Sequence, residues 1–268
     1  MTQMPLGRVL IIAGSDSGGG AGIQADIKSV TALGGFAATA ITALTAQNTL
    51  GVHGIHEVPP EFVAQQIDVV LSDIGADAIK TGMLHRTDVL DAVIGALNGA
   101  ADNIPLVVDP VMVAKGGHSL LDEDTRSVVR QRLIPRAALL TPNIPEAEIL
   151  SGMTISDEDG MARAGAKLLT LGPRAVLMKG GHLPGAEVVD LLLSDHGRER
   201  FSCPRIDSRH THGTGCTLAS AIACGLAQGL AVAAAVARAR DYVLQAIRTA
   251  PGLGQGHGPL NHGHTLSG

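Results

Sequence analysis

The sequence has very few aromatic residues, with three Phe, one Tyr and no Trp among its 268 residues. Proteins that hold single-stranded nucleic acid stack its bases on aromatic rings, so this composition argues against that class. A basic surplus is also missing, because 25 acidic and 20 basic residues leave a formal net charge of −5. Without such a surplus, neither nucleic acid nor an anionic membrane surface is an expected partner.

Long apolar runs are absent as well. No stretch approaches the roughly 18 consecutive apolar residues of a membrane-spanning helix, and the opening MTQMPLGRVLIIAG does not have the pattern of a signal peptide. The only cysteines are Cys203, Cys216 and Cys224, with no CxxC pair, which argues against a disulfide framework or a structural zinc site. We therefore expect a soluble protein of the cytoplasm.

What the sequence does contain is an alternation of strand-length apolar runs with segments of helical periodicity. In 22–34, for example, apolar residues recur at Ile23, Ile27 and Val30, the spacing of one helix face. Strands are expected at 8–14, 37–46, 77–82, 105–110, 137–143 and 175–181, with a hairpin or adjacent strands at 187–194 and 198–203. Helices are expected at 22–34, 59–74, 87–97, 122–134, 156–172, 214–230 and 232–249.

This rhythm predicts an α/β fold, with a mostly parallel sheet covered on both faces and a single domain over 1–268. Ligands of such sheets bind at the carboxyl ends of the strands. Polar and glycine-rich segments follow the predicted strands at 14–22 (GSDSGGGAG), 45–48 (TAQN), 80–83 (KTGM), 109–112 (DPVM), 141–143 (TPN), 179–182 (KGGH) and 211–217 (THGTGCT). The functional site is expected where these segments meet.

The segment THGTGCT leads into an alanine-rich helix. The first N–H groups of a helix have no internal partner and carry partial positive charge, and Gly213 and Gly215 would let an anion approach them closely. Cys216 falls on the first turn, where the helix dipole lowers a thiol pKa below about 8.5, which makes it a candidate proton acceptor or nucleophile. The alternatives are a connection without a ligand and a thiol that fills space in the core.

Other polar residues have both a functional and a structural interpretation. GSDSGGGAG lacks the Gly-Lys-Ser/Thr ending of a P-loop, so a loop around a substrate is the better interpretation, with Asp26 as a hydrogen-bonding or merely solvated neighbour. Asn143 and Glu146 share a face of one helical turn, which with Asp109 suits a hydrated Mg²⁺, unless Asn143 only caps the helix. Lys179 offers a cation to phosphates, or to solvent.

Taken in order, these motifs resemble those of the hydroxymethylpyrimidine/phosphomethylpyrimidine kinases of thiamine synthesis, which belong to the ribokinase-like superfamily. The matching segments are IAGSDSGGGAGIQADIK, ITALTAQNT, KTGML, VVDPVMVAKGG, LLTPNIPEAE, VLMKGGH, THGTGCTLASAIA and GHGPLNH, and they span nearly the whole chain. The resemblance implies a three-layer α/β/α sandwich that transfers the γ-phosphoryl group of ATP, with Mg²⁺, to 4-amino-5-hydroxymethyl-2-methylpyrimidine. It also implies a second transfer to the monophosphate, and a homodimer.

The resemblance further assigns roles to individual residues. Cys216 is the implied catalytic residue, because related sugar kinases have at that position an aspartate that acts as the base. Thr45 departs from the family, which often has Val there. The implied substrate pocket is Gln47, Gly14, Asp26 and Met83. The implied contacts to ATP and its phosphates are Lys179, His212, Gly213, Thr214 and Gly215. The implied holders of Mg²⁺ are Asn143, Glu146 and Asp109.

Three alternatives stay open. A pyridoxal kinase would share the fold and the phosphate turn. A thiol hydrolase would use Cys216 as nucleophile and His212 as its base, and a ligand sensor would keep the fold without the chemistry. The histidines near the end of the chain, His257, His262 and His264, are interpreted as structural, since no cysteine or paired-helix spacing makes them a ligand set.

Overall fold

The computed structural model describes residues 6–99, 101–112 and 122–266. Strands and helices alternate along these ranges. In chain order they are β1 (Arg8–Ala13), α1 (Gly22–Ala32), β2 (Phe36–Ile41), β3 (Ala43–Asn48), β4 (Gly51–Glu57), α2 (Pro60–Asp73), β5 (Ala78–Thr81), α3 (Thr87–Leu97), β6 (Leu106–Val108), α4 (Glu123–Val128), β7 (Leu139–Leu140), α5 (Ile144–Ser151), α6 (Glu158–Leu169), β8 (Ala175–Lys179), β9 (Glu187–Ser194), β10 (Gly197–Pro204), α7 (Thr214–Ala227) and α8 (Val232–Arg248).

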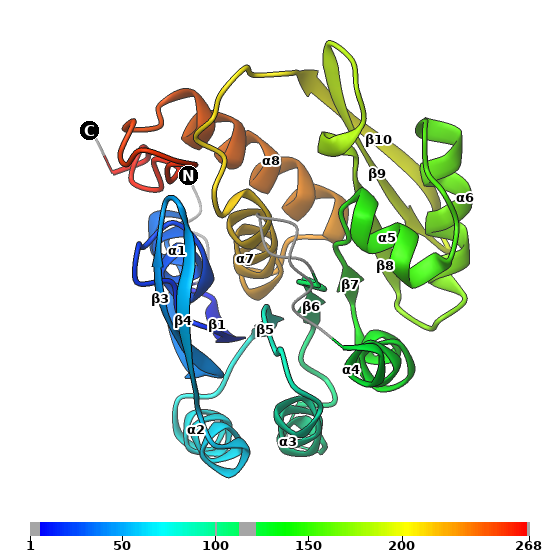
Figure 1. The fold of residues 1–268 in the computed structure, drawn as a ribbon. Helices are drawn as coiled ribbons and strands as arrows, with labels where there is room; N and C mark the ends of the chain where they lie inside the picture. Colours follow the sequence, from blue (N-terminus) through cyan, green and yellow to red (C-terminus); the bar gives the residue numbers. More distant parts are fainter. Residues whose placement is uncertain (1–5, 100, 113–121, 267–268) are drawn as a thin grey trace.

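An eight-stranded sheet forms the centre, in the order β10-β9-β8-β7-β6-β5-β1-β2 (Figure 1). The pairs from β2 through β8 are parallel, whereas β9 and β10 are antiparallel to their neighbours, as the predicted hairpin requires. Parallel neighbours need crossover connections, which the intervening helices supply. The carboxyl ends of the parallel strands therefore lie along one edge of the sheet.

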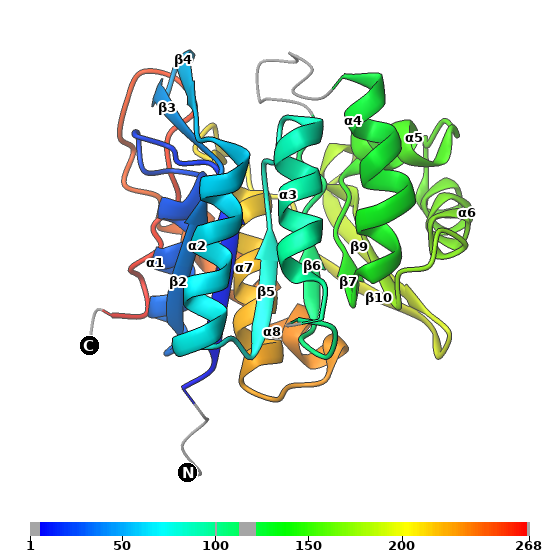
Figure 2. The ribbon, with the colours of Figure 1, turned by 90° about the horizontal axis from the view of Figure 1, so that it is seen from below.

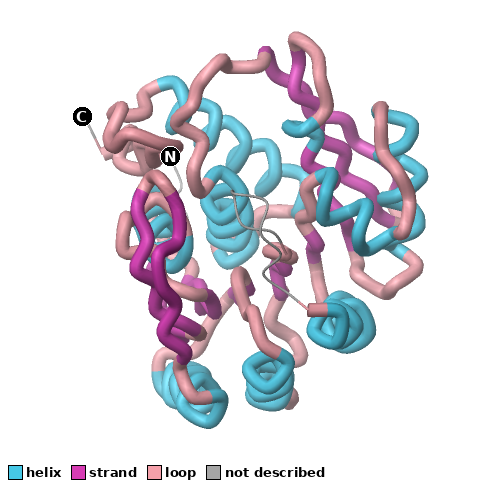
Figure 3. The backbone as a smooth tube through the Cα atoms, viewed as in Figure 1, coloured by secondary structure: helices cyan, strands magenta, loops and turns pink. Residues whose placement is uncertain are grey.

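Each face of the sheet has its own apolar core, because successive residues of a strand point to opposite faces. Val9 and Ile11 of β1 pack with residues of α1, α7 and α8. Leu10 and Ile12 pack with residues of α2, α3, α5 and α6. Helices thus cover both faces (Figure 3), and the predicted three-layer α/β/α class is confirmed.

Helix α7 lies at the centre of one of these layers, and every residue from Thr217 to Gly225 is buried. Small side chains make such close packing possible. A Cβ added at Gly225 would lie 2.8 Å from the Cβ of Ala235 in α8. Because α7 is held on its sides by α1, α8 and the sheet, its first turn has a fixed position at the carboxyl edge.

The prediction of one strand over 37–46 is wrong, because the chain leaves the sheet at Thr42. The Thr42 amide donates to Ala13 O at 3.1 Å and its hydroxyl donates to Met83 O at 2.8 Å. Beyond it, β3 pairs with β4 in a separate two-stranded sheet, and Figure 2 shows this hairpin standing beyond the carboxyl edge. No glycine or proline in the sequence marks the end of β2. The strand β4 was not predicted because the glycines and histidines of GVHGIHE are not a typical strand pattern.

Two other predicted elements differ in length. The helix expected at 122–134 begins as α4 but continues through a π-helical turn, Val129–Leu133, and a 3-10 turn, Ile134–Arg136. The strand expected at 137–143 is continuous only over β7, Leu139–Leu140. Asn143 forms an isolated bridge and then caps α5. Among the described ranges, no helix combines the length and the apolar character needed to cross a membrane.

Candidate active site

Most of the predicted site residues meet at the carboxyl edge of the sheet. Gly14 follows β1, Met83 follows β5 and Asp109 follows β6, while Lys179 is the last residue of β8 and Asn143 pairs with it in an isolated bridge. The amino end of α7 lies at the same edge, because a Cβ added at Gly215 would be 3.4 Å from Lys179 Nζ and 3.7 Å from Asp109 Oδ2. The prediction that these residues meet at the carboxyl ends of the strands is therefore confirmed.

Lys179 and Asp109 form a nearly buried ion pair. Lys179 Nζ donates to Asp109 Oδ1 at 3.0 Å, and the side chains are 13% and 3% exposed. Burial alone would lower the pKa of the Lys179 amino group, but the carboxylates of Asp109 and Glu146 outweigh burial and raise it. The ammonium therefore stays charged beside the first turn of α7, where an incoming phosphate would meet both.

Asn143 and Glu146 form a reciprocal cap on α5. Asn143 Oδ1 accepts from the Glu146 amide at 3.0 Å, and Glu146 Oε2 accepts from the Asn143 amide at 2.8 Å. The structural interpretation of Asn143 as a cap is thus confirmed. Burial raises the pKa of Glu146 to about 7, with Lys179 opposing and Asp109 adding to that effect.

Replacing Asn143 with alanine should lower the free energy of unfolding by about 1 kcal/mol, because the Glu146 amide loses its acceptor. Urea denaturation of the wild-type and variant proteins measures the difference. Asn143→Ser is the matched control, since serine also caps helices, and it should keep most of the stability. An alanine variant as stable as the serine variant would show that the cap contributes nothing.

Cys216 lies on the first turn of α7 and is half-buried. Burial raises the pKa of its thiol to about 11, and the carboxylates of Asp26 and Asp109 add to the rise, whereas Lys80 and the Gly22 amide oppose it. The predicted lowering of this pKa by the helix dipole is therefore wrong for the unliganded protein. The dipole is a local effect, and burial outweighs it.

The raised pKa predicts slow alkylation of Cys216 that accelerates with pH. Only the thiolate reacts, so the rate with iodoacetamide should rise about tenfold per pH unit from pH 7 to 10. Mass spectrometry of the peptide that contains Cys216 follows this residue apart from Cys203 and Cys224. A rate that levels off below about pH 9 would mean that the dipole controls the thiol after all.

Asp26 does not face the expected pocket. It is completely buried, its Oδ2 accepts from Lys80 Nζ at 2.8 Å and its Oδ1 accepts from the Ser220 hydroxyl at 2.7 Å. Both oxygens are thus used inside the protein, which corrects the expectation that Asp26 bonds the substrate directly. The three side chains link α1, β5 and α7 one helical turn below Cys216.

Lys80 was missed by the sequence analysis. Its side chain is completely buried and its ammonium pairs with Asp26. Burial alone would lower its pKa, but Asp26, Cys216 and Asp109 raise it. The available signal was a single charged residue inside a strand, AIKT, whose other residues belong to the core.

Gly14 and Met83 lie together next to Ala43, the first residue of the β3–β4 hairpin. A Cβ at Gly14 would lie 2.6 Å from Met83 Cε and 3.5 Å from Ala43 O. A larger residue at position 14 would require the Met83 side chain to move. The structure therefore brings these two predicted pocket residues into contact.

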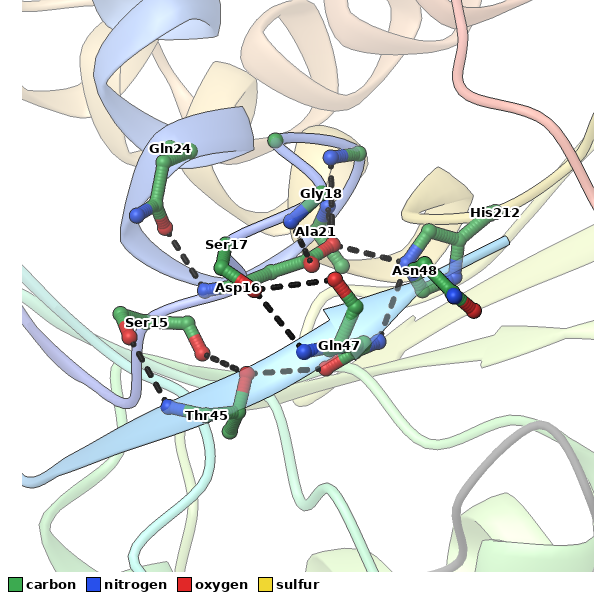
Figure 4. Close-up of polar contacts among 12 residues, drawn as sticks. Ser15, Asp16, Ser17, Gly18, Ala21, Gln24, Thr45, Gln47, Asn48 and His212 are labelled. Atoms are coloured by element: carbon green, nitrogen blue, oxygen red, sulfur yellow. Dashed lines mark hydrogen bonds and ion pairs between the residues drawn. The ribbon is translucent and has the colours of Figure 1, made fainter. Parts of the chain in front are cut away.

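Gln47 is part of a hydrogen-bond network that joins three segments (Figure 4). Its carboxamide lies 3.2 Å from His212 Nε2 at one end and 3.3 Å from Thr45 Oγ1 at the other. His212 Nε2 in turn lies 2.8 Å from Asp16 Oδ2. His212 was expected at the phosphates of ATP, but the structure directs its side chain toward Gln47 and Asp16.

Asp16 also escaped the sequence analysis. Its carboxylate accepts from the amides of Gly18, Gly20 and Ala21, at 2.8, 3.1 and 2.8 Å, in addition to the contact with His212. Burial raises the pKa of Asp16, but these hydrogen bonds outweigh it and hold that pKa below its usual value. The charged carboxylate thus shapes the glycine-rich loop after β1, and its place between two serines in SDS gave no sign of this.

The glycine-rich loop and the turn before α7 touch at two glycines. Gly213 has φ +84°, and a Cβ there would lie 1.8 Å from Gly20 O. No other residue type fits such an approach. The loop that shapes the Gln47 side of the site and the turn that opens α7 are therefore held as one unit.

A cavity of about 670 Å³ lies on the other side of α7 from Gln47. Lys179, Asn143, Thr214 and Gly215 line one end, and Leu244 and Ile247 of α8 are among the apolar residues that line it farther along. Its size and mixed lining suit a nucleotide with a charged phosphate end. Two of the predicted ATP contacts, His212 and Gly213, do not line it.

The histidines near the end of the chain have protein partners. His262 is buried and bonds the Thr217 hydroxyl at 2.9 Å, and burial lowers its pKa to about 4. His264 Nε2 bonds Tyr242 O, while the Tyr242 hydroxyl donates to His262 O at 2.6 Å. His257 Nδ1 bonds Arg209 O. This segment packs against α7 and α8 and supports the turn at His212, whose amide donates to Gly258 O at 3.2 Å.

Comparison with known proteins gives consistent matches. A family model described as phosphomethylpyrimidine kinase matches residues 16–261. The chain is 50% identical over 258 residues to the hydroxymethylpyrimidine/phosphomethylpyrimidine kinase of Streptomyces coelicolor, covering 96% of this chain and 95% of that one. It is 46% identical over 260 residues to the enzyme of that name from Bacillus subtilis, covering 97% and 96%.

A third relative is longer than this chain. The thiamine biosynthesis bifunctional protein ThiED of Geobacter sulfurreducens is 56% identical over 258 residues, which cover 96% of this chain. The match spans only 52% of the bifunctional protein.

Solved structures show the same fold. A Bacillus subtilis pyridoxal kinase in complex with ADP superposes with a TM-score of 0.91 at 33% identity, covering 98% of this chain and all of that one. A phosphomethylpyrimidine kinase from Clostridium difficile has a TM-score of 0.80 at 41% identity, covering 90% and 99%. The ribokinase-like fold that the motifs implied is thereby confirmed.

Proposed function

The chain belongs to the phosphomethylpyrimidine kinase family, and from this we propose that it carries out two successive phosphoryl transfers of thiamine biosynthesis. The first moves the γ-phosphoryl group of ATP to the hydroxyl of 4-amino-5-hydroxymethyl-2-methylpyrimidine. The second moves another such group to the phosphate of the product, which gives the diphosphate. One catalytic domain over the whole chain performs both transfers.

The observation that carries this proposal is the position of α7 between two dissimilar regions. On one side, Lys179 lines the end of a nucleotide-sized cavity and pairs with Asp109. On the other lie Gln47, bonded to Thr45 and His212, and Met83, against Gly14; we assign this side to the pyrimidine. The first turn of α7 separates them, so a phosphoryl group passing between the ligands would meet the Gly215 and Cys216 amides of that turn.

Phosphoryl transfer requires alignment and neutralisation of charge more than covalent chemistry. The acceptor oxygen attacks phosphorus as the bond to the leaving ADP oxygen breaks. We assign stabilisation of the equatorial oxygens to the amides of Gly215 and Cys216, together with the Lys179 ammonium; the Thr214 amide already donates to Thr211 O at 3.4 Å. Cys216, in its thiolate form, would take the hydroxyl proton in the first transfer. The second acceptor is an anion and releases no such proton.

ATP is the phosphoryl donor, and Mg²⁺ is its proposed companion. The residues fit a hydrated ion, because the carboxylates of Glu146 and Asp109 lie close enough to influence each other's charge beside Lys179 and carboxylate oxygens are ligands of Mg²⁺. Asn143 would act by holding Glu146, since its own oxygen caps α5. The ion, when bound, supplies charge neutralisation to the ATP phosphates.

The test is incubation of the pure protein with the pyrimidine alcohol and MgATP, followed by mass detection of monophosphate and diphosphate. We expect both products in sequence, and loss of both when Lys179 is replaced with methionine. ATP consumption without either product would refute the proposal. Because a pyridoxal kinase has a TM-score of 0.91, pyridoxal is assayed alongside, and a higher kcat/KM for pyridoxal would favour that second candidate.

We further propose that the protein is a homodimer of the cytoplasm. The β3–β4 hairpin and its turn expose Leu44, Leu50, Val52 and Ile55, which are 43–66% accessible, and apolar surface of this kind favours a protein partner. The three cysteines are free thiols, in keeping with a reducing compartment. Light scattering tests the dimer, and a monomeric mass at micromolar concentration would exclude it.

A further inference from the structure

The backbone of Gln47 is held by a single serine hydroxyl. Its backbone amide donates to Ser17 Oγ at 2.8 Å, and its carbonyl accepts from the same hydroxyl at 2.9 Å. The carboxamide has its Nε2 3.2 Å from His212 Nε2 and its Oε1 3.3 Å from Thr45 Oγ1. A half-turn about the last side-chain bond exchanges these two atoms, so the neighbours decide which orientation is stable.

His212 must present a proton to Gln47. Its Nε2 lies 2.8 Å from Asp16 Oδ2, and that carboxylate is ionised because backbone amides from Gly18 to Ala21 also bond it. A bare ring nitrogen would set its lone pair against this negative charge. Nε2 therefore carries hydrogen, which Asp16 accepts. It has no lone pair for an N–H of Gln47, so only the oxygen of Gln47 can face it favourably, by sharing that hydrogen.

Thr45 must present a lone pair to Gln47. Its hydroxyl has a single proton, and Thr45 Oγ1 lies 2.9 Å from the carbonyl oxygen of Ser15, which can only accept. The proton is thus committed to Ser15. The group that faces Thr45 from Gln47 has to be a donor.

We propose that Thr45 and His212 together lock the Gln47 carboxamide in one orientation, with its NH₂ group donating to Thr45 and its oxygen accepting from His212. The opposite orientation sets two donors against each other at His212 and two acceptors against each other at Thr45. Both mismatches vanish with the half-turn. Asp16 acts through His212, so Asp16, His212 and Thr45 are positioning residues for Gln47.

The lock has a consequence for the substrate, which rests on the proposed function. One N–H and one lone pair of the carboxamide remain free, and they match the ring nitrogen and adjacent amino group of a 4-aminopyrimidine. The amino group then lies at the oxygen end, toward His212. The hydroxymethyl group is on the ring carbon next to the amino-bearing carbon, so it extends toward the turn from His212 to Cys216. A reversed carboxamide would direct the same hydroxyl away from that turn.

The orientation itself is tested without substrate, by nuclear Overhauser contacts in the ¹⁵N-labelled protein. We expect the side-chain N–H protons of Gln47 to show contacts to the β and γ protons of Thr45 and none to the ring protons of His212. Strong contacts to the His212 ring would overturn the lock. This measurement does not depend on any catalytic activity.

The consequence is tested by kinetics in two matched pairs of variants. Thr45→Val removes the acceptor and should lower kcat for the pyrimidine alcohol by less than about twofold with little change in KM, because the ring still binds and His212 still favours the productive orientation. Thr45→Ser keeps the hydroxyl and should match wild type. His212→Leu and His212→Gln form the second pair, since glutamine retains a donor.

The double variant Thr45→Val/His212→Leu should lose more kcat than the product of the two single losses, because only then are the two orientations equivalent. Melting temperatures confirm that each variant is folded. A rise in KM at constant kcat, or a double variant that loses no more kcat than either single variant, would overturn the proposed consequence. A wild-type protein that leaves the pyrimidine alcohol unmodified would instead refute the proposed function, while the Overhauser result would still decide the lock.

Discussion

Replacing Cys216 with alanine is expected to slow phosphorylation of the pyrimidine alcohol about 100-fold, while the second transfer slows less than tenfold. A primary hydroxyl has to lose its proton as it attacks, whereas the phosphate acceptor of the second transfer is already an anion. The amides of the α7 turn act in both transfers and survive the substitution. Quenched-flow assays that start from the alcohol and from the monophosphate measure the two rates separately.

The pH dependence sharpens this prediction. The pKa of Cys216 is raised to about 11, and a base works only when deprotonated, so the first transfer should accelerate with rising pH through the neutral range and the alanine variant should lose that slope. Cys224→Ala is the matched control. Cys224 lies in the same helix, but it is buried in the core and its Sγ contacts Val30 O rather than the site. Equal losses in both transfers, or none in either, would contradict a proton-accepting role.

Replacing Lys80 with methionine is expected to lower the free energy of unfolding by about 3–5 kcal/mol. The substitution leaves Asp26 completely buried, with only the Ser220 hydroxyl as a partner. A carboxylate without its counter-ion is costly in the core, and the surrounding side chains of β5 and α7 prevent water from reaching it. Urea denaturation followed by circular dichroism measures the loss.

The matched control for this prediction is Lys80→Met combined with Asp26→Asn. The double variant removes both charges and keeps an oxygen for Ser220, so it should recover most of the lost stability. Recovery would show that the unpaired charge, rather than the changed packing of residue 80, causes the loss. A double variant as unstable as the single one would contradict the electrostatic explanation.

The sequence was sufficient for those features that depend on local pattern. Strands buried on both faces have continuous apolar runs, as in LVV of β6, and this pattern predicted the parallel sheet and its carboxyl edge. The same pattern predicted the place of Gly14, Asp109 and Lys179 at the site, because each of them ends or comes directly after a predicted strand. The reciprocal cap of Asn143 and Glu146 is equally local, because both partners lie within one helical turn.

Other features depend on partners far apart in the chain. The Lys80–Asp26 pair joins residues 54 positions apart, and His212 reaches Asp16 across 196 positions. His212 adjoins the phosphate turn in sequence, yet its side chain points to the opposite side of α7 from the cavity. The pKa of Cys216 follows the same principle, because the dipole is visible in the sequence but the burial that outweighs it is not.

Tyr242 offers an optical consequence of the scarcity of aromatic residues. It is the one tyrosine in a chain without tryptophan. Its hydroxyl donates to His262 O in the C-terminal segment. The next two residues, Val243 and Leu244, line the cavity beside α7. Ultraviolet emission of the protein therefore originates almost entirely from this phenol. Detachment of the tail, or arrival of a nucleotide, can be followed by intrinsic fluorescence without any label and without an indole background.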